Sequence, residues 1–494
     1  MSVATLFAAL AARRPDAAVL HGSQGIWRAG ALGAEIEAVA KRLAGTRVMA
    51  ILADNSPDWA IADLAALKSS TVALPLPLFF TPAQLSHALT QSGADLVLTD
   101  QPERVLSLDL GFAVSETRRD IVWLRRRTAP VTLPDGTVKI SFTSGSTGAP
   151  KGVCLSAGGL LDTARSLHTR LADLPIERHL AVLPLALLLE NSAGLYAPLL
   201  RGTEIHLPSL ASLGWQGMSG FNPQALQQAV AEVRPNSVIL VPELLKAWSQ
   251  FLARSKQSAP KELSYVAVGG SRVEASLLTQ ARRLGLPAYQ GYGLTECGSV
   301  VSLNRPGDDG YGVGRPLPHV RTVIRSGEIH VATRAFLGYL GTPSPDAAEY
   351  ATGDLGQFDE AGHLHLSGRR KNLLITSFGR NVSPEWVEAA LLAQPQIAQA
   401  LVAGDGQLSL AAIVVPFPGV ADDELATAIG HANASLPDYA RIGQWLVAAP
   451  FTPQNGQLTG NGRPVRTAIL NHHAAALAAL YDEQPTQEPA HVLL

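Results

Sequence analysis

The sequence is poor in cysteine: it has two, Cys154 and Cys297, among 494 residues. Two thiols cannot form a disulfide framework or a four-thiolate metal site, and this composition favours a reducing compartment, with the cytoplasm as the expected location.

Neither sign of charge is in clear excess: the sequence has 39 lysines and arginines and 41 aspartates and glutamates, for a formal net charge of −2. Without a global positive field, nucleic acid is not an expected partner, and an anionic ligand must be held by local groups.

The sequence also lacks an uninterrupted membrane segment. Its longest apolar run covers residues 180–200, but Glu190 and Asn191 lie in the middle of it. A carboxylate is costly near the centre of a bilayer, so we expect a buried element here and no integral membrane segment. At the amino terminus, Arg13 and Arg14 follow the apolar stretch instead of preceding it, which is not the order of a secretory signal.

The chain is longer than one hydrophobic core usually supports, about 250 to 300 residues, so we expect at least two domains. The expected early elements are strands at 47–53, 71–76 and 94–99, a helix from the cap Ser56-Pro57-Asp58, and a helix from Thr81-Pro82 to Ser92-Gly93. This alternation predicts an α/β fold, with a large N-terminal domain of helix-covered mixed β-sheets over residues 1–369. Residues 371–494 are expected to form a small C-terminal α+β domain, with a disordered tail after Asp482.

A segment rich in glycine and hydroxyl side chains reads Ile140-Ser-Phe-Thr-Ser-Gly-Ser-Thr-Gly-Ala-Pro-Lys151-Gly152. Glycine lets the backbone close around an anion, hydroxyls donate hydrogen bonds, and lysine adds a positive charge. The segment therefore predicts a polyphosphate-binding loop made of Thr143, Ser144, Gly145, Ser146, Thr147, Gly148 and Lys151. It is not a Walker A loop, because Pro150 stands where that motif needs glycine. A flexible linker, the alternative, leaves the strand expected at 137–140 unexplained.

Two further segments carry polar side chains. In Gln290-Gly-Tyr-Gly-Leu-Thr-Glu296, Tyr292 offers a face on which a base can stack and Glu296 a hard oxygen ligand for magnesium, although an ordinary loop is an open alternative. In Tyr350-Ala-Thr-Gly-Asp354 the aspartate can accept from both ribose hydroxyls, and Arg369 can reach the same nucleotide. A β-hairpin turn at 359–362 is the alternative there, and both interpretations can hold at once.

These segments, in this order, resemble the core motifs of the adenylate-forming (AMP-binding) superfamily of acyl-CoA synthetases, nonribosomal-peptide adenylation domains and firefly-type luciferases. The resemblance extends over nearly the whole chain, including Asn55-Ser-Pro-Asp-Trp59 and Asn455-Gly-Gln-Leu-Thr459. It implies an acyl-CoA synthetase/luciferase-like fold whose small domain is mobile about a hinge at Lys371. It also implies ATP and Mg²⁺, formation of an acyl adenylate, and transfer of the acyl group to CoA or to the phosphopantetheine of a carrier protein.

Carried over position by position, the resemblance assigns roles to individual residues. The loop from Thr143 to Lys151 would hold the β- and γ-phosphates, Thr295 would contact the α-phosphate, and Glu296 would bind Mg²⁺. The remaining nucleotide contacts would come from Tyr292 on adenine, from the backbone at Gly269, Gly270 and Gly293, and from Asp354 and Arg369 on the ribose. Ser377 to Gly379 would line the approach of the thiol. The implied catalytic residues are Lys151, Thr295, Glu296 and Arg463.

Arg463 marks a departure from the family pattern, which places a lysine near the end of the small domain. Lys371 is the last lysine of the sequence, and the matching stretch reads Leu458-Thr-Gly-Asn-Gly-Arg463-Pro-Val-Arg466. Arginine keeps the charge but differs in reach and hydration. We expect adenylation to persist with Arg463 between carboxylate and nucleotide; the alternatives are a lost first half-reaction or another cation such as Arg466.

The substrate is expected to be an aliphatic, medium- or long-chain fatty acid. Leu187 and its neighbours follow Pro184 where many relatives carry an aromatic residue or histidine, and Phe79 and Phe80 are further candidates for an apolar acyl site. The resemblance therefore favours an acyl-CoA ligase. A stand-alone enzyme that loads a carrier protein and a non-catalytic nucleotide-binding homologue stay open as alternatives.

Overall fold

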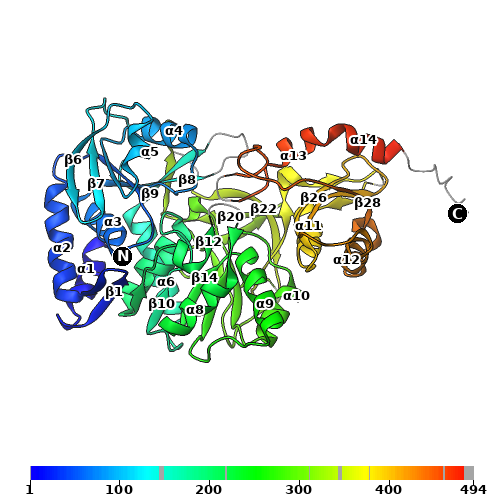
Figure 1. Cartoon of the computed structure of the whole chain (residues 1–494), viewed down its shortest axis with the longest axis horizontal. Helices are drawn as coiled ribbons and strands as arrows, with labels where there is room; N and C mark the ends of the chain where they lie inside the picture. Colours follow the sequence, from blue (N-terminus) through cyan, green and yellow to red (C-terminus); the bar gives the residue numbers. More distant parts are fainter. Residues whose placement is uncertain are drawn as a thin grey trace, which may run out of the picture. The chain divides into compact units, whose positions relative to one another are not determined.

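The computed structural model describes residues 2–143, 150–216, 220–310, 312–342, 348–377, 379–459 and 462–482. The chain divides into two compact units, Met1–Leu366 and Ser367–Leu494, which are described separately here (Figure 1). The expected α/β class with mixed sheets is confirmed. The Ser144–Ala149 part of the glycine-rich segment and the tail after Asp482 lie outside the described residues.

Two large sheets dominate the first unit. One runs in the order β18 (Arg315–Pro316), β17 (Ser302–Leu303), β16 (Ala288–Tyr292), β15 (Tyr265–Val268), β14 (Ser237–Leu240), β10 (Arg178–Leu180), β11 (Glu204–His206), β1 (Ala18–Gly22) and β2 (Gly25–Arg28). The other runs in the order β21 (Phe336–Tyr339), β9 (Lys151–Ser156), β8 (Thr137–Thr143), β4 (Val72–Pro75), β3 (Val48–Leu52), β5 (Leu96–Thr99), β7 (Ile121–Arg125) and β6 (Ala113–Arg118). Both sheets mix parallel and antiparallel pairs.

Smaller sheets and the helices complete this unit. One small sheet has the order β19 (Arg321–Arg325), β20 (Glu328–Ala332), β22 (Tyr350–Phe358) and β23 (Leu364–Arg369), whose last strand crosses the boundary between the units, and β12 (Trp215–Gln216) pairs with β13 (Gly220–Phe221). The helices are α1 (Val3–Ala11), α2 (Ala29–Arg42), α3 (Pro57–Ser69), α4 (Pro82–Ser92), α5 (Pro102–Leu106), α6 (Ala157–Arg170), α7 (Ala197–Arg201), α8 (Pro223–Val233), α9 (Pro242–Ser255) and α10 (Ala275–Arg283). Short helical turns are η1 (Glu190–Tyr196), η2 (Ala211–Leu213) and η3 (Thr295–Cys297).

Local capping contacts explain where helices α3 and α4 begin. The Ser56 hydroxyl accepts a hydrogen bond from the backbone N–H of Trp59, and Pro57 occupies the first helical position of α3. Thr81 and Gln84 form a capping box at α4, which ends at Gly93 with φ of +62°. The capped helices predicted at both places are confirmed.

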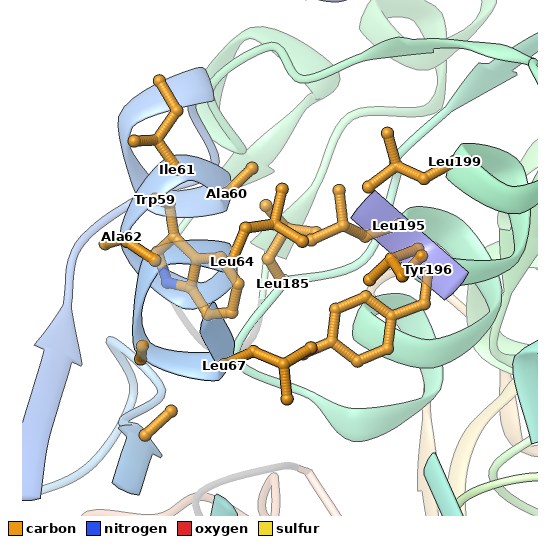
Figure 2. Close-up of a cluster of buried hydrophobic side chains, with 14 of the residues drawn as sticks. Trp59, Ala60, Ile61, Ala62, Leu64, Leu67, Leu185, Leu195, Tyr196 and Leu199 are labelled. Atoms are coloured by element: carbon orange, nitrogen blue, oxygen red, sulfur yellow. The ribbon is translucent and has the colours of Figure 1, made fainter. Parts of the chain in front are cut away.

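The apolar run at 180–200 is a buried but irregular element. It begins with the end of β10, continues as a chain without regular structure, and forms the π-helix η1 before α7. Leu195 and Tyr196 of η1 pack against Leu64 and Leu67 of α3, as Figure 2 shows. Within the described parts of the chain, no helix is long and apolar enough to cross a membrane.

The second unit is a small α+β unit. Its sheet has the order β26 (Ile397–Ala403), β27 (Leu410–Pro416) and β28 (Ile442–Val447), and β24 (Leu374–Ile375) pairs with β25 (Asn381–Val382). Its helices are α11 (Pro384–Leu392), α12 (Asp422–Ala434), α13 (Arg466–His472) and α14 (Ala474–Asp482), with short turns η4 (Arg370–Asn372) and η5 (Asp438–Ala440). β26 and β27 form the antiparallel pair that the sequence predicts, and Gly406 of the connecting turn has φ of +71°.

Candidate active site

The glycine-rich segment is held at both ends by one β-hairpin. β8 extends to Thr143, beyond the predicted end of the strand at Ile140, and β9 begins at Lys151. Thr143 lies directly opposite Lys151 in the antiparallel register. The carbonyl oxygen of Pro150 lies 3.2 Å from Nε2 of His87. Ser144, Gly145, Ser146, Thr147 and Gly148 lie outside the described residues, so the structure describes the flanks of the predicted phosphate loop only.

Tyr339 joins the lysine of this hairpin to the predicted magnesium ligand. The Nζ atom of Lys151 lies 5.6 Å from the centre of the Tyr339 ring, and the Tyr339 hydroxyl donates to Oε1 of Glu296 over 3.0 Å. The hydroxyls of Tyr339 and Tyr350 are 2.9 Å apart. Burial raises the pKa of Tyr339 to about 12, and the nearby Glu296 carboxylate acts in the same direction. The phenol therefore stays protonated near neutral pH and can donate to Glu296.

A second contact joins two further predicted nucleotide residues of the first unit. Tyr292, the last residue of β16, donates from its hydroxyl to Oδ2 of Asp354 over 2.7 Å. Burial, and then the Asp354 charge, raises the pKa of the Tyr292 phenol, so that it remains a donor. The turn before the aspartate is fixed from both sides: the backbone N–H of Gly353 donates to Oε1 of Glu328, and the N–H of Asp354 donates to the Thr352 hydroxyl.

Close backbone packing accounts for one glycine of the segment that carries Thr295 and Glu296. A Cβ placed on Gly293 would lie 1.7 Å from the carbonyl oxygen of Ser299, a distance that no real side chain adopts. The chain can therefore turn directly from β16 into the short helix Thr295–Cys297, which presents the half-buried Glu296.

The predicted glycine pair lies at the carboxyl ends of parallel strands. Gly269 and Gly270 follow β15, which pairs in parallel with β14 and β16, and the N–H of Gly269 donates to the carbonyl of Leu240. Gly270 has φ of +97°, in the left-handed region that favours glycine. Ligands of α/β sheets commonly bind at such strand ends. This edge therefore brings the glycine pair near the end of β16, which carries Tyr292.

The described hydrophobic contacts do not bring the leucine run and the two phenylalanines together. Leu189 lies near Gly269, because a Cβ on that glycine would be 3.7 Å from Cδ2 of Leu189. Phe80 is buried in a different hydrophobic cluster, with Leu76 and Leu85, and Phe79 packs against that cluster. The expectation that Phe79 and Phe80 join the leucines in one acyl wall therefore finds no support among the described contacts.

Glu190, in the middle of the apolar run, has a buried partner. Its Oε1 lies 2.8 Å from Nε2 of His179, and its Oε2 accepts from the N–H of Leu183 over 3.1 Å. Nδ1 of His179 lies 2.9 Å from the Ser237 hydroxyl. Burial raises the pKa of Glu190. A Cβ on Gly194 would lie 1.9 Å from Oε1 of Glu190 and 2.7 Å from Nε2 of His179, so a side chain there would displace this pair.

A second buried polar cluster fixes the strand that leads into the hairpin. Lys139 on β8 donates from Nζ to Oδ1 of Asp63 over 2.7 Å, to the hydroxyl of Tyr196 over 2.9 Å, and to Oδ1 of Asn191. The hydroxyl of Tyr196 and the amide of Asn191 donate in turn to Oδ2 of Asp63. Lys139 is 2% exposed and Asp63 0%, so this ion pair ties β8, α3 and η1 together away from water.

The remaining predicted residues belong to the second unit. Arg369 ends β23, Lys371 lies in η4, and Ser377 and Gly379 follow β24, with residue 378 outside the described chain. The backbone N–H of Arg463 donates to the Thr459 hydroxyl over 3.0 Å, and residues 460 and 461 are not described. Their predicted roles toward the nucleotide and the thiol stay predictions.

Arg466, the alternative cation, already has partners within the second unit. Its guanidinium donates to the buried carboxylate of Glu388 and to the carbonyl of Val402. These contacts indicate a structural role for Arg466. Cys154 and Cys297 are buried free thiols, and burial raises the pKa of Cys154 to about 11, so neither is an activated nucleophile.

Sequence reasoning missed Tyr339 and the Lys139 cluster. Tyr350 opens one of the quoted motifs, but its contact with Tyr339 depends on the pairing of β21 with β9, which no local pattern reveals. The Lys139 cluster could have been predicted in part, because a lysine within an apolar strand needs a buried counter-charge.

Comparison with known proteins supports the adenylate-forming assignment. Residues 7–332 match the AMP-binding enzyme family, and residues 371–485 match the AMP-binding enzyme C-terminal domain. Long-chain-fatty-acid–CoA ligase FadD15 of Mycobacterium bovis is 25% identical, with 89% of this chain and 89% of that protein covered. The 2-succinylbenzoate–CoA ligase of Bacillus velezensis is 29% identical, with 72% and 74% covered.

The fold has solved counterparts. O-succinylbenzoate coenzyme A synthetase (MenE) of Bacillus subtilis, in complex with ATP and magnesium ion, superposes with a TM-score of 0.74 at 23% identity, covering 94% of this chain and 98% of that one. Because the family match spans more than half of the sequence, the chain belongs to the AMP-binding enzyme family, the AMP-forming acid–thiol ligases.

Proposed function

We propose that this enzyme uses ATP to convert a carboxylic acid into an acyl adenylate and then transfers the acyl group to the thiol of CoA. The observation that carries the proposal is the chain of contacts from Lys151 through Tyr339 to Glu296. These contacts support the proposal because they link a lysine that we propose to bind phosphate with a carboxylate that we propose to bind Mg²⁺. The contact between Tyr292 and Asp354, the residues proposed for adenine and ribose, lies in the same unit and gives further support.

In the first half-reaction a carboxylate oxygen attacks the α-phosphorus of ATP, and the bond from that phosphorus to the leaving pyrophosphate breaks. Two anions must approach each other, so positive charge and N–H donors are needed where the charge develops. Thr143 and Lys151, with the loop between them, would hold the β- and γ-phosphates, and Thr295 the α-phosphate. In the second half-reaction the thiol sulfur attacks the acyl carbon and AMP leaves.

Glu296 fits a magnesium ligand. Mg²⁺ prefers carboxylate oxygens and is usually bound by one or two of them together with substrate phosphates. The Glu296 carboxylate is half-buried, and Tyr339 fixes its orientation through Oε1. When bound, the ion would neutralise charge on the phosphates. Tyr339 is in this proposal a positioning residue for Glu296.

The remaining nucleotide contacts come from both units. Tyr292 would stack on adenine beside the backbone of Gly269, Gly270 and Gly293, while Asp354 and Arg369 would hold the ribose. Arg463 would bridge the substrate carboxylate and the nucleotide in place of the family's lysine, after which a rotation about Lys371 would bring Ser377 to Gly379 to the thiol. Exclusion of water during this sequence protects the mixed anhydride from hydrolysis.

An aliphatic acid is the proposed substrate class. Leu187 and Leu189 are the partly exposed members of an otherwise buried leucine run, and Leu189 lies near Gly269 at the strand edge that carries the nucleotide site. An apolar wall of this kind suits an alkyl chain. One relative is named for long-chain fatty acids and another for 2-succinylbenzoate, so the choice between a fatty and an aryl acid needs a direct assay.

Exchange of labelled pyrophosphate into ATP, screened over aliphatic and aromatic acids, tests the first half-reaction and the substrate class together. We expect exchange with medium- or long-chain acids, its loss in Glu296→Gln, and its retention in Glu360→Gln, which alters an exposed carboxylate of the same unit. Silence over the whole panel would contradict the proposal and favour a nucleotide-binding homologue. CoA and a phosphopantetheinylated carrier protein, assayed side by side with the active acid, identify the acceptor.

Variants of Arg463 test the replacement of the lysine. We expect Arg463→Ala to slow pyrophosphate release strongly and Arg463→Lys to restore part of the rate, because lysine keeps the charge but not the planar fork. An alanine variant as fast as the unaltered enzyme would remove Arg463 from the proposed mechanism.

A further inference from the structure

Two histidines and a glutamate that lie far apart in the sequence meet in the first unit, on strands outside the proposed active site. His21 lies on β1, and Glu204 and His206 lie on the adjacent parallel strand β11. His21 is directly opposite His206 in the register. Glu204 precedes His206 by two residues, so both side chains leave β11 on the same face of the sheet.

The three side chains bring potential ligand atoms close together. Nε2 of His21 lies 3.0 Å from Oε2 of Glu204, and one ligand atom from each of the three residues lies within 4.8 Å of the other two. The two imidazole rings are stacked, with centroids 4.0 Å apart and planes inclined by 13°. His21, Glu204 and His206 are half-buried, whereas Ile205 and Leu207, the neighbours of His206 on β11, are buried.

His206 has an unsatisfied nitrogen in this cluster. Its Nε2 is buried and has no hydrogen-bond partner within the part of the chain that the structure describes. A buried polar atom without a partner carries a free-energy cost, which a bound ion or solvent molecule can remove.

We propose that His21, Glu204 and His206 form a site for one divalent first-row transition-metal ion, with Zn²⁺ as the best match. Two imidazole nitrogens and one carboxylate oxygen are a donor set that this class of ion prefers, with Zn–N near 2.0 to 2.1 Å. The site is independent of the proposed ligase reaction. Because His21 belongs to β1 and the other two ligands to β11, the ion would cross-link residues about 180 positions apart in the sequence, near the sheet edge formed by β1 and β2.

Binding requires one small rearrangement. Stacked imidazoles direct their nitrogen lone pairs in nearly parallel planes, so one ring must rotate about its terminal torsion before both can face one ion. That torsion has a broad energy profile in histidine, so the rotation is inexpensive. Arg178 on β10 is the register partner of Glu204, and its positive charge disfavours a bound cation. The negative charge of the Glu204 carboxylate offsets part of this repulsion.

The test uses the tag-free full-length chain after treatment with a chelator and buffer exchange. Calorimetric titration with ZnCl₂ measures stoichiometry and affinity, and the visible absorption of added Co²⁺ reports coordination by protein ligands. We expect one ion per chain and a rise in the unfolding temperature with Zn²⁺, since a ligand that binds only the folded state stabilises it. His21→Ala, His206→Ala and Glu204→Gln are each expected to weaken binding at least tenfold.

His472→Ala is the matched control, because His472 is exposed and its ring lies 4.8 Å from that of His473, another adjacent imidazole pair. This variant is expected to bind Zn²⁺ as the unaltered chain does. His206→Asn, similar in size, replaces His206→Ala if the alanine variant unfolds at a lower temperature in chelator. Zn²⁺ binding that is absent at micromolar concentration, or equal in the unaltered chain and the three ligand variants, would overturn the proposal and leave a stacked histidine pair with a neighbouring carboxylate.

Discussion

The buried ion pair between Lys139 and Asp63 provides the most quantitative stability prediction. Lysine has three N–H donors at Nζ, and all three are used here, on Asp63, Asn191 and Tyr196. Replacement of Lys139 by methionine keeps most of the volume but leaves the Asp63 carboxylate buried without its cation. Breaking a buried pair in this way typically costs about 3 to 5 kcal/mol of unfolding free energy.

The lower end of that range is expected for Lys139→Met. Asp63 retains two donors after the change, the Tyr196 hydroxyl at 2.6 Å and the Asn191 amide at 3.1 Å, which continue to stabilise the carboxylate. We therefore expect a loss of about 3 kcal/mol. The double variant Lys139→Met, Asp63→Asn is expected to lose less than the sum of the two single losses, because each single change leaves one charge unpaired.

Urea unfolding followed by tryptophan fluorescence measures this effect, since Trp59 is buried on the same helix as Asp63. Lys261→Met, at an exposed position of the same unit, is the control and should change the midpoint little. A Lys139→Met variant with the same midpoint as this control would show that the ion pair does not stabilise the fold. So would strictly additive losses in the double variant.

Two further predictions concern Gly293 and Tyr339 of the site, and a third concerns the half-buried imidazole of His319, which lies 3.0 Å from the Thr163 hydroxyl. Gly293→Ala should lower the rate of pyrophosphate exchange about 100-fold, because the loop backbone must move to make room for the Cβ. Gly33→Ala is the control and should leave the exchange rate unchanged, because a Cβ there meets open space. Equal exchange rates in the two variants would contradict the prediction. Tyr339→Phe removes a hydrogen bond to the Glu296 carboxylate, which is worth about 1.5 kcal/mol. The Mg²⁺ concentration that gives half-maximal exchange should therefore rise roughly tenfold. An unchanged Mg²⁺ dependence would exclude a positioning role for Tyr339. Burial lowers the pKa of His319 from 6.5 to about 4, so the unfolded chain binds more protons between these values. The free energy of unfolding should therefore decrease as the pH falls from about 6.5 to 4, and this decrease should be smaller in His319→Gln. The same dependence of unfolding free energy on pH in His319→Gln and in the unaltered chain would contradict the prediction.

Elements that depend on a few neighbouring residues could be predicted from the sequence. The start of α3 after Ser56 and the box between Thr81 and Gln84 are decided within one helical turn, and they occur where the sequence places them. β15 spans Tyr265–Val268, as its short apolar run indicates. Capping and short hydrophobic runs are local properties, which explains their reliability.

Contacts between distant segments could not be predicted in the same way. Glu190 was recognisable as a buried carboxylate, but its partner His179 became identifiable only with the π-helix in place. Tyr339 reaches Glu296 because β21 pairs with β9, and His21 reaches His206 because β1 pairs with β11. The order of strands in a sheet depends on the packing of the whole unit, so it cannot be predicted from local patterns in a single sequence.

In the proposed first half-reaction a carboxylate oxygen of the substrate bonds to the α-phosphorus of ATP. The active acid, labelled with ¹⁸O at both carboxylate positions, is supplied together with ATP, Mg²⁺ and CoA, and the mass of the nucleotide product is measured by mass spectrometry. Attack at the α-phosphorus followed by thiol attack on the acyl carbon predicts AMP that carries one ¹⁸O, with pyrophosphate unlabelled. Unlabelled AMP, or label in inorganic phosphate beside ADP, would contradict the account.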